Sequence, residues 1–204
     1  YGDHRDLHLS LRRQRQMCIR DSYGGISIMS ELRTNRIVPR NGLVTNAMGG
    51  IIQTVHVSYD SPFDTTTTGG VDTGLTATIN MQSASNKLLI TCSALWSTIS
   101  NEAYMALTDS SNNIIDQPAA RGSRGRYHWG AHYNGAGGNS TYHSARESVT
   151  LLHAPASTGN FTVKLRIYNI NSGQTVALNR NLYDGDRIYD PAGVSTLTLF
   201  EVTA

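Results

Sequence analysis

The sequence predicts an all-β domain over residues 49–204, built as an antiparallel β-sandwich or jelly roll of about eight strands. Apolar and polar residues alternate in many of its short segments, as expected for strands whose side chains point to opposite faces in turn. Clusters of Gly, Asn, Asp and Ser separate these segments, and no segment after Met29 has a convincing helical period. Long chains with this pattern form two-sheet sandwiches or jelly rolls.

Three segments in the first half of the domain predict strands. IIQTVHVSY, residues 51–59, places Ile51, Val55, Val57 and Tyr59 on one face. LTATINM, residues 75–81, alternates in the same way. In NKLLITCSALW, residues 86–96, one face is wholly apolar and the other also carries leucines. We therefore expect this third segment to be a central strand covered on both faces.

The second half continues the pattern. AYMAL and NII flank the turn cluster TDSSNN and predict a hairpin. NFTVKLRIYNI, residues 160–170, has the cleanest alternation in the chain, with Phe161, Val163, Leu165 and Ile167 on the buried face. Three further strands are predicted in ESVTLLHAP, QTVALNRN and the closing VSTLTLFEV. Because the last of these runs nearly to Ala204, we expect it to be a central element of its sheet.

Residues 1–28 look foreign to the domain. YGDHRDLH and RRQRQMCIRDS back-translate, in one reading frame, to a sequence that resembles a sequencing-library adapter, so residues 1–22 resemble a translated laboratory oligonucleotide. YGGISI can be encoded with a ribosome-binding site ahead of Met29. We therefore expect residues 1–28 to be a non-native leader and Met29 to be the native start.

Without this leader the chain carries no net charge. Residues 1–28 hold five of the 17 Lys and Arg and three of the 15 Asp and Glu, which leaves twelve of each sign. The basic character of the whole chain is therefore no argument for nucleic acid as a partner. Cys92 is left as a lone cysteine in an apolar segment, which favours a small buried side chain over a nucleophile. No segment is long and apolar enough to predict membrane insertion.

Two segments depart from the strand pattern. Residues 29–48 are short, polar and punctuated by Pro39 and Gly42, which predicts an N-terminal attachment arm. Residues 117–145 hold six glycines and three of the seven histidines without any strand pattern. Loops of this length are usually functional or disordered.

The motifs SELRTNRIVPRNGL, GGIIQTV, SASNKLLITCSALW, LHAPAS, VALNRN and VSTLTLFEV follow one another along the chain. With them, Met29–Ala204 resembles a family of tail-fibre-like virion structural proteins from tailed phages of marine bacteria. The resemblance implies a homotrimeric β-sandwich or jelly-roll head, made in the bacterial host cytoplasm and displayed on the virion. It implies contacts with other virion proteins through the N-terminal arm, and it supplies neither catalytic residues nor a cofactor.

Several short patterns suggest chemistry, and each has a simpler explanation. His128 and His132 in HWGAH have a metal-ligand spacing on a helix, but the flanking glycines argue against a helix there. RGSRGR, residues 121–126, would suit a phosphate or sulfated sugar, or would simply be solvated. YDGDRIYD, residues 183–190, faintly resembles a calcium loop but is better explained as a turn between the last two strands. The carboxylates fall in separate turns and strand faces, so we do not expect an enzyme, and a glycan hydrolase is the weakest hypothesis.

The aromatic residues of the 117–145 loop are the strongest candidates for receptor binding. Tyrosine, tryptophan and histidine rings combine flat faces with hydrogen-bonding edges and have few rotatable bonds. The alternative is that some of these rings pack inside the domain or at a subunit interface. The candidate receptor-binding residues are Arg126, Tyr127, His128, Trp129, His132, Tyr133 and Tyr142.

These observations leave two main hypotheses. The first is a phage structural protein whose 117–145 loop recognises a host-surface glycan or protein, with avidity supplied by a trimer. The second is a capsid decoration or baseplate protein with a purely structural role, in which the same loop contacts other virion proteins.

Overall fold

The computed structural model describes residues 50–99, 103–130, 144–170, 173–188 and 190–203. All of them belong to one unit, Asn46–Ala204. The predicted leader (residues 1–28) and the predicted attachment arm (residues 29–48) lie outside the described residues. The described part of the chain contains nine β-strands and no helix, which confirms the predicted all-β class.

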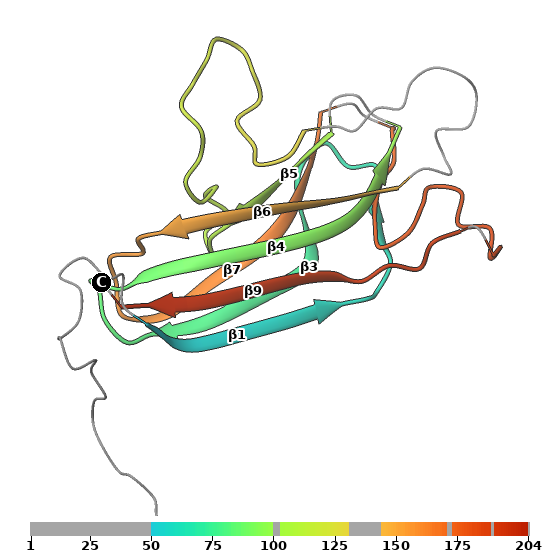
Figure 1. The fold of residues 1–204 in the computed structure, drawn as a ribbon. Helices are drawn as coiled ribbons and strands as arrows, with labels where there is room; N and C mark the ends of the chain where they lie inside the picture. The colour runs from blue at the N-terminus through green and yellow to red at the C-terminus, as the bar shows by residue number, and fades with distance from the viewer. Residues whose placement is uncertain (1–49, 100–102, 131–143, 171–172, 189, 204) are drawn as a thin grey trace, which may run out of the picture. The chain divides into compact units, whose positions relative to one another are not determined.

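The strands form two antiparallel sheets (Figure 1). In the six-stranded sheet β4 is central, because it pairs with β6 along one edge and with β9 and then β8 along the other. β1 pairs with the other edge of β9, and β2 pairs with the other edge of β8. The strands of this sheet are β1 (Ile51–Tyr59), β2 (Phe63–Thr65), β4 (Lys87–Thr98), β6 (Ala145–His153), β8 (Val176–Leu178) and β9 (Ser195–Val202).

The second sheet has three strands in the order β3-β7-β5. They are β3 (Gly69–Met81), β5 (Ala103–Thr108) and β7 (Gly159–Asn169). Trp129 forms an isolated antiparallel bridge with Met105 of β5, on the edge of β5 that does not pair with β7. From β3 to β8 the chain alternates between the two sheets, as in a jelly roll.

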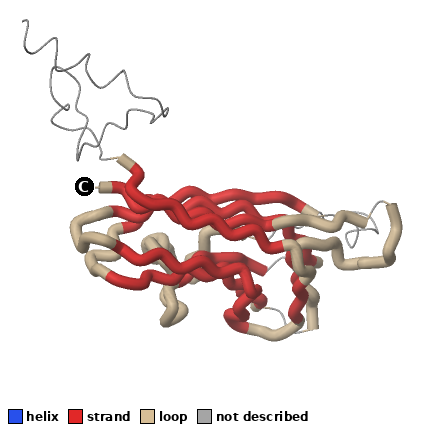
Figure 2. The backbone as a smooth tube through the Cα atoms, turned by 90° about the horizontal axis from the view of Figure 1, so that it is seen from below, coloured by secondary structure: helices blue, strands red, loops and turns tan. Residues whose placement is uncertain are grey.

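The inner faces of the two sheets make one hydrophobic core. Figure 2 shows the two layers of strands that enclose it. Leu88, Ile90 and Trp96 of β4 are at most 1% exposed, and Val163 and Leu165 of β7 are fully buried. Both strands therefore follow the alternation that the sequence predicts. β9 lies between β1 and β4, so the expectation that the last strand is central is confirmed.

Three details differ from the sequence-based expectations. The register shifts between Ile51 and Gln53, and Ile51 is 57% exposed instead of sharing the buried face of β1. The expected strand at residues 75–81 begins earlier, at Gly69. The short strand β2 was not predicted, since three residues give no readable alternation.

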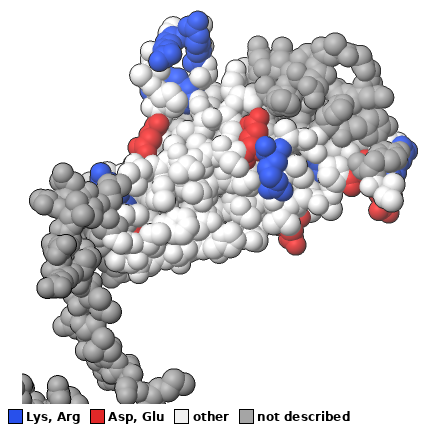
Figure 3. Space-filling view, viewed as in Figure 1, with Lys and Arg blue, Asp and Glu red and all other residues white. Residues whose placement is uncertain are grey.

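The outer face of the six-stranded sheet is almost free of charge, and Figure 3 shows it largely white. Leu89, Thr91, Ser93 and Leu95 of β4 point to this face and are only half-buried, so β4 is not covered on both faces as expected. Their cross-strand neighbours are uncharged except at the ends of the sheet. The three central rows are Thr54–Phe200–Leu89–Leu152, His56–Thr198–Thr91–Thr150 and Ser58–Thr196–Ser93–Ser148.

Asn179, the residue after β8, forms side-chain hydrogen bonds with three other segments of the chain. It has a positive φ of 62° and is 2% exposed. Its side-chain amide donates to the carbonyl oxygens of Tyr59 (2.8 Å) and Ser61 (3.1 Å). Its side-chain oxygen accepts from the hydroxyl of Ser195 (2.6 Å). A single buried asparagine therefore joins the end of β1, the segment before β2 and the start of β9.

Glu201 plays a similar part at the opposite end of β9. Its carboxylate accepts hydrogen bonds from the side chains of Gln53 and Asn86 and from the backbone N–H of Gln82. Desolvation alone would raise the pKa of this carboxyl group. The hydrogen bonds outweigh desolvation, so the pKa lies below its ordinary value.

Candidate functional site

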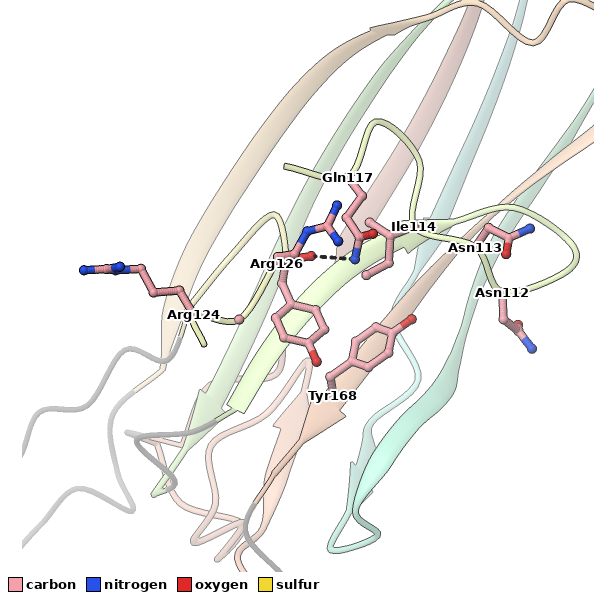
Figure 4. Close-up of a pocket in the computed structure, with 9 residues that line it drawn as sticks. Asn112, Asn113, Ile114, Gln117, Arg124, Arg126 and Tyr168 are labelled. Atoms are coloured by element: carbon pink, nitrogen blue, oxygen red, sulfur yellow. Dashed lines mark hydrogen bonds between the residues drawn. The ribbon is translucent and has the colours of Figure 1, made fainter. Parts of the chain in front are cut away.

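A pocket of about 560 Å³, here called the tyrosine pocket, opens between the turn after β5, the segment 124–127 and β7 (Figure 4). Its size lies in the roughly 300–1,000 Å³ range of small-ligand sites. Its lining combines amide, guanidinium and phenol groups and contains no carboxylate. The lining residues are Asn112, Asn113, Ile114, Gln117, Arg124, Gly125, Arg126, Tyr127 and Tyr168.

Tyr127 and Tyr168 make the aromatic wall of the pocket, and Tyr104 supports the Tyr127 ring. Tyr104 of β5 and Tyr168 of β7 are cross-strand neighbours, which places both on the outer face of the three-stranded sheet. The Tyr127 ring stacks on Tyr104, with ring centroids 4.6 Å apart, and lies 4.7 Å from Tyr168. A Cβ at Gly125 would lie 3.0 Å from the Tyr127 ring, so a larger residue there would displace the ring by a few tenths of an ångström. Burial, with a smaller effect of the neighbouring tyrosines, raises the pKa of Tyr127 and keeps its phenol neutral.

The turn after β5 supplies the amide wall. The Asp109 carboxylate accepts from the backbone N–H groups of Ser111 and Asn113 and from the side-chain amide of Asn113. Asn112, with a positive φ of 69°, accepts a hydrogen bond from the Lys164 ammonium group (2.5 Å). The predicted hairpin closes here, through the bridge between Thr108 and Ile114. Both asparagines are thus held at the pocket edge by a rigid turn.

Trp129 faces the core, and His128 is half-buried, with both ring nitrogens bonded to the backbone. The His128 Nδ1 accepts from the backbone N–H of Leu107 (3.0 Å), and its Nε2 donates to the carbonyl of Ile115 (2.8 Å). Desolvation lowers the pKa of His128, so the ring stays neutral. Trp129 is 7% exposed and belongs to the hydrophobic core. These two rings pack in the domain, which is the alternative that the sequence left open for the aromatic cluster.

The arginines of the loop frame a second, adjoining pocket of about 220 Å³, here called the arginine pocket. The Arg126 Nε donates to the carbonyl of Pro118 (2.6 Å), and Gln117 donates to the carbonyl of Arg126 (3.3 Å). Arg124 donates to the carbonyl of Arg121 (3.1 Å). These bonds fold residues 117–126 back on themselves and hold the guanidinium groups at the pocket.

The structure therefore brings together two of the seven predicted residues, Arg126 and Tyr127, at the tyrosine pocket. His132, Tyr133 and Tyr142 lie outside the described residues. The sequence analysis missed Tyr104 and Tyr168. A signal for Tyr168 was present, because Thr162, Lys164 and Arg166 alternate on the exposed face of β7 and Tyr168 continues their series.

The acidic segment after β8 forms a turn, as the sequence analysis favoured. One carboxylate oxygen of Asp190 accepts from the Asn181 side chain, and the other accepts from the backbone N–H groups of Gly185 and Arg187. Asp184 pairs with Arg180 (3.0 Å). Within the described ranges, the structure contains no group of three or more His, Cys, Asp or Glu residues that would hold a metal ion.

Comparison with models of known protein families and with curated proteins gives no match for this chain. Over the part of the chain that the structure describes, no helix has the length and hydropathy to cross a membrane.

Proposed function

We propose that this chain is a tail-fibre-like virion structural protein of a tailed phage, and that its β-sandwich binds a host-surface glycan in the tyrosine pocket. The virion assignment is supported by the motifs that resemble the phage family. One observation above all supports the binding assignment: tyrosine rings, amide groups and arginine side chains line the same open pocket.

Sugars are recognised by this combination of groups. Pyranose rings present apolar C–H faces that pack on aromatic rings, and their hydroxyls exchange hydrogen bonds with amide and guanidinium groups. The tyrosine pocket offers both on one rigid base, since Tyr168 is anchored in β7 and Asn112 in a closed turn. Binding of this kind requires no covalent chemistry, in keeping with the expectation that the chain is not an enzyme.

A polysaccharide array with bacterial surface glycans tests this function. We expect Tyr168→Ala to weaken binding of the retained glycan about tenfold, since one aromatic contact contributes on the order of 1 kcal/mol or more. Gln117→Ala, at an exposed position of the pocket, should weaken it without a change in stability. Tyr183→Ala serves as the matched control because Tyr183 is exposed and lies outside the pocket. Equal binding by all three variants would refute the assignment.

The second candidate is a capsid decoration or baseplate protein with a structural role, and the uncharged outer face of the six-stranded sheet favours it. A second copy of the chain could cover the rows through Leu89 and Thr91, whose cross-strand neighbours carry no formal charge. Phage particles carrying Tyr168→Ala separate the two candidates. Intact particles that fail to adsorb support receptor binding, and failure to assemble supports the structural role.

The proposed homotrimer is tested by light scattering on purified Met29–Ala204 beside the full chain. We expect both to have the mass of a trimer, because we place residues 1–28 outside the native protein. A stable monomer of Met29–Ala204 would exclude the trimeric head and favour a decoration module that assembles only with a partner.

A further inference from the structure

We infer that the glycan is anionic, with its sugar ring in the tyrosine pocket and a carboxylate or sulfate group in the arginine pocket. This inference rests on the proposed function and adds the chemical class of the ligand. The inference is based on the fact that the two pockets adjoin, since both are lined by Arg124, Gly125 and Arg126. A single ligand in the first pocket therefore lies directly beside the second.

The arginine pocket concentrates positive charge. Arg121, Arg124 and Arg126 supply three of its six lining residues, and none of the six is acidic. Figure 3 shows this charge as blue atoms on the loop that projects at the top of the view. Such a cluster attracts an anion, because three neighbouring cations repel one another until a negative group neutralises them.

The loop arginines differ from Lys164, Arg166 and Arg180 in having no carboxylate partner among the described residues. Lys164 and Arg166 both pair with Asp72, and Arg180 pairs with Asp64 and Asp184. Among the described residues, no ion pair forms to Arg121, Arg124 or Arg126. The positive charge of these three arginines is therefore not neutralised by a described carboxylate and is available to an anionic ligand.

The guanidinium groups also keep free hydrogen-bond donors. Each guanidinium has five N–H donors, and the bonds to Pro118 and Arg121 use one donor on Arg126 and one on Arg124. These backbone bonds orient the side chains before the ligand arrives. Guanidinium groups bind carboxylate and sulfate oxygens in pairs, which gives both strength and orientation.

A short anionic substituent fits this surface better than nucleic acid does. Nucleic-acid binding requires cations spread along many phosphates, whereas these arginines are confined to one loop. The twelve positive and twelve negative side chains of residues 29–204 balance each other. The arginine pocket is thus a local feature suited to one charged group.

Matched pairs of polysaccharides test the inference with the full chain. The carboxylate arm compares polygalacturonate oligosaccharides with their carboxyl-reduced form, and the sulfate arm compares a sulfated galactan with its desulfated form. We expect at least tenfold tighter binding of the charged member in one arm, which identifies the oxyanion. The tyrosine-pocket variant Tyr168→Ala should weaken the same interaction.

The charge variants are Arg124→Gln and the double variant Arg121→Gln/Arg124→Gln, with Arg146→Gln as the matched control on the exposed edge strand β6. We expect the first two to remove most of the preference for the charged glycan and Arg146→Gln to leave it unchanged. Equal loss with Arg146→Gln would show non-specific attraction and overturn the inference. Equal, Tyr168-dependent binding of charged and neutral glycans would overturn it but leave the proposed function standing. Binding of no glycan would contradict both.

Discussion

Replacing Asn179 tests whether one buried side chain holds together the end of β1, the segment before β2 and the start of β9. Asn179 has a positive φ of 62°, so the substitutions separate two effects. Asn179→Gly keeps the backbone conformation available and removes only the side-chain hydrogen bonds. Asn179→Ala removes the same bonds and adds the strain of a left-handed conformation, about 1–2 kcal/mol.

The expected magnitude follows from the contacts. Three side-chain hydrogen bonds are lost, to the carbonyls of Tyr59 and Ser61 and from the hydroxyl of Ser195. Each contributes on the order of 1 kcal/mol, so Asn179→Gly should lower the free energy of unfolding by about 3 kcal/mol. With the added strain, Asn179→Ala should lower it by about 4–5 kcal/mol.

Urea denaturation followed by far-UV circular dichroism measures both effects. At a slope of about 2 kcal/mol per molar urea, the midpoint should fall by roughly 1.5 M for Asn179→Gly and by more than 2 M for Asn179→Ala. Asn80→Ala, at an exposed position of β3, is the control and should stay within about 0.5 kcal/mol of the native protein. An Asn179→Gly midpoint that matches this control would refute the reasoning.

Three further predictions concern buried groups. Trp129→Ala should lower the free energy of unfolding by about 3–5 kcal/mol, measured in urea, because Trp129 lies in the core. Burial raises the pKa of Cys92 to about 12, so in a Cys18→Ser background the Cys92 thiol should react with Ellman's reagent only after unfolding; rapid reaction in the native state would contradict its burial. The folded pKa of Glu201 lies below 4.5 and that of His128 below 6.5, so the unfolded state binds more protons and stability should fall as pH drops below each ordinary value. Glu201→Gln should flatten the lower part of this profile, and an unchanged profile would exclude Glu201 as its source.

Much of the fold could be predicted because burial imposes a period of two on strands. Residues 160–170 show this most clearly, since of the four expected inner residues Val163, Leu165 and Ile167 are fully buried and Phe161 is partly buried against the core. The central position of β9 was also predictable. The shift at Ile51 was not, because a bulge changes the face of a residue without changing the composition around it.

The site was only partly predictable, since it depends on contacts between distant segments. The loop was recognised from its glycines and aromatic residues, and Tyr127 and Arg126 do line a pocket. Trp129 was grouped with them by sequence proximity, but its backbone pairs with Met105 and its side chain enters the core. Asn112 reaches the pocket from the turn after β5, and no local pattern shows which turns lie beside which loops. The resemblance to phage proteins named a class of function but no site residues.

The most direct test of glycan binding at the tyrosine pocket is an NMR titration of the isotope-labelled full chain with the glycan retained in the array or polysaccharide experiments. We expect backbone amide shifts to concentrate at residues 112–117 and 124–127 and at Tyr168, the segments that line the tyrosine pocket. Shifts that concentrate instead on β1 and β6, or the absence of saturable shifts, would contradict the proposed site.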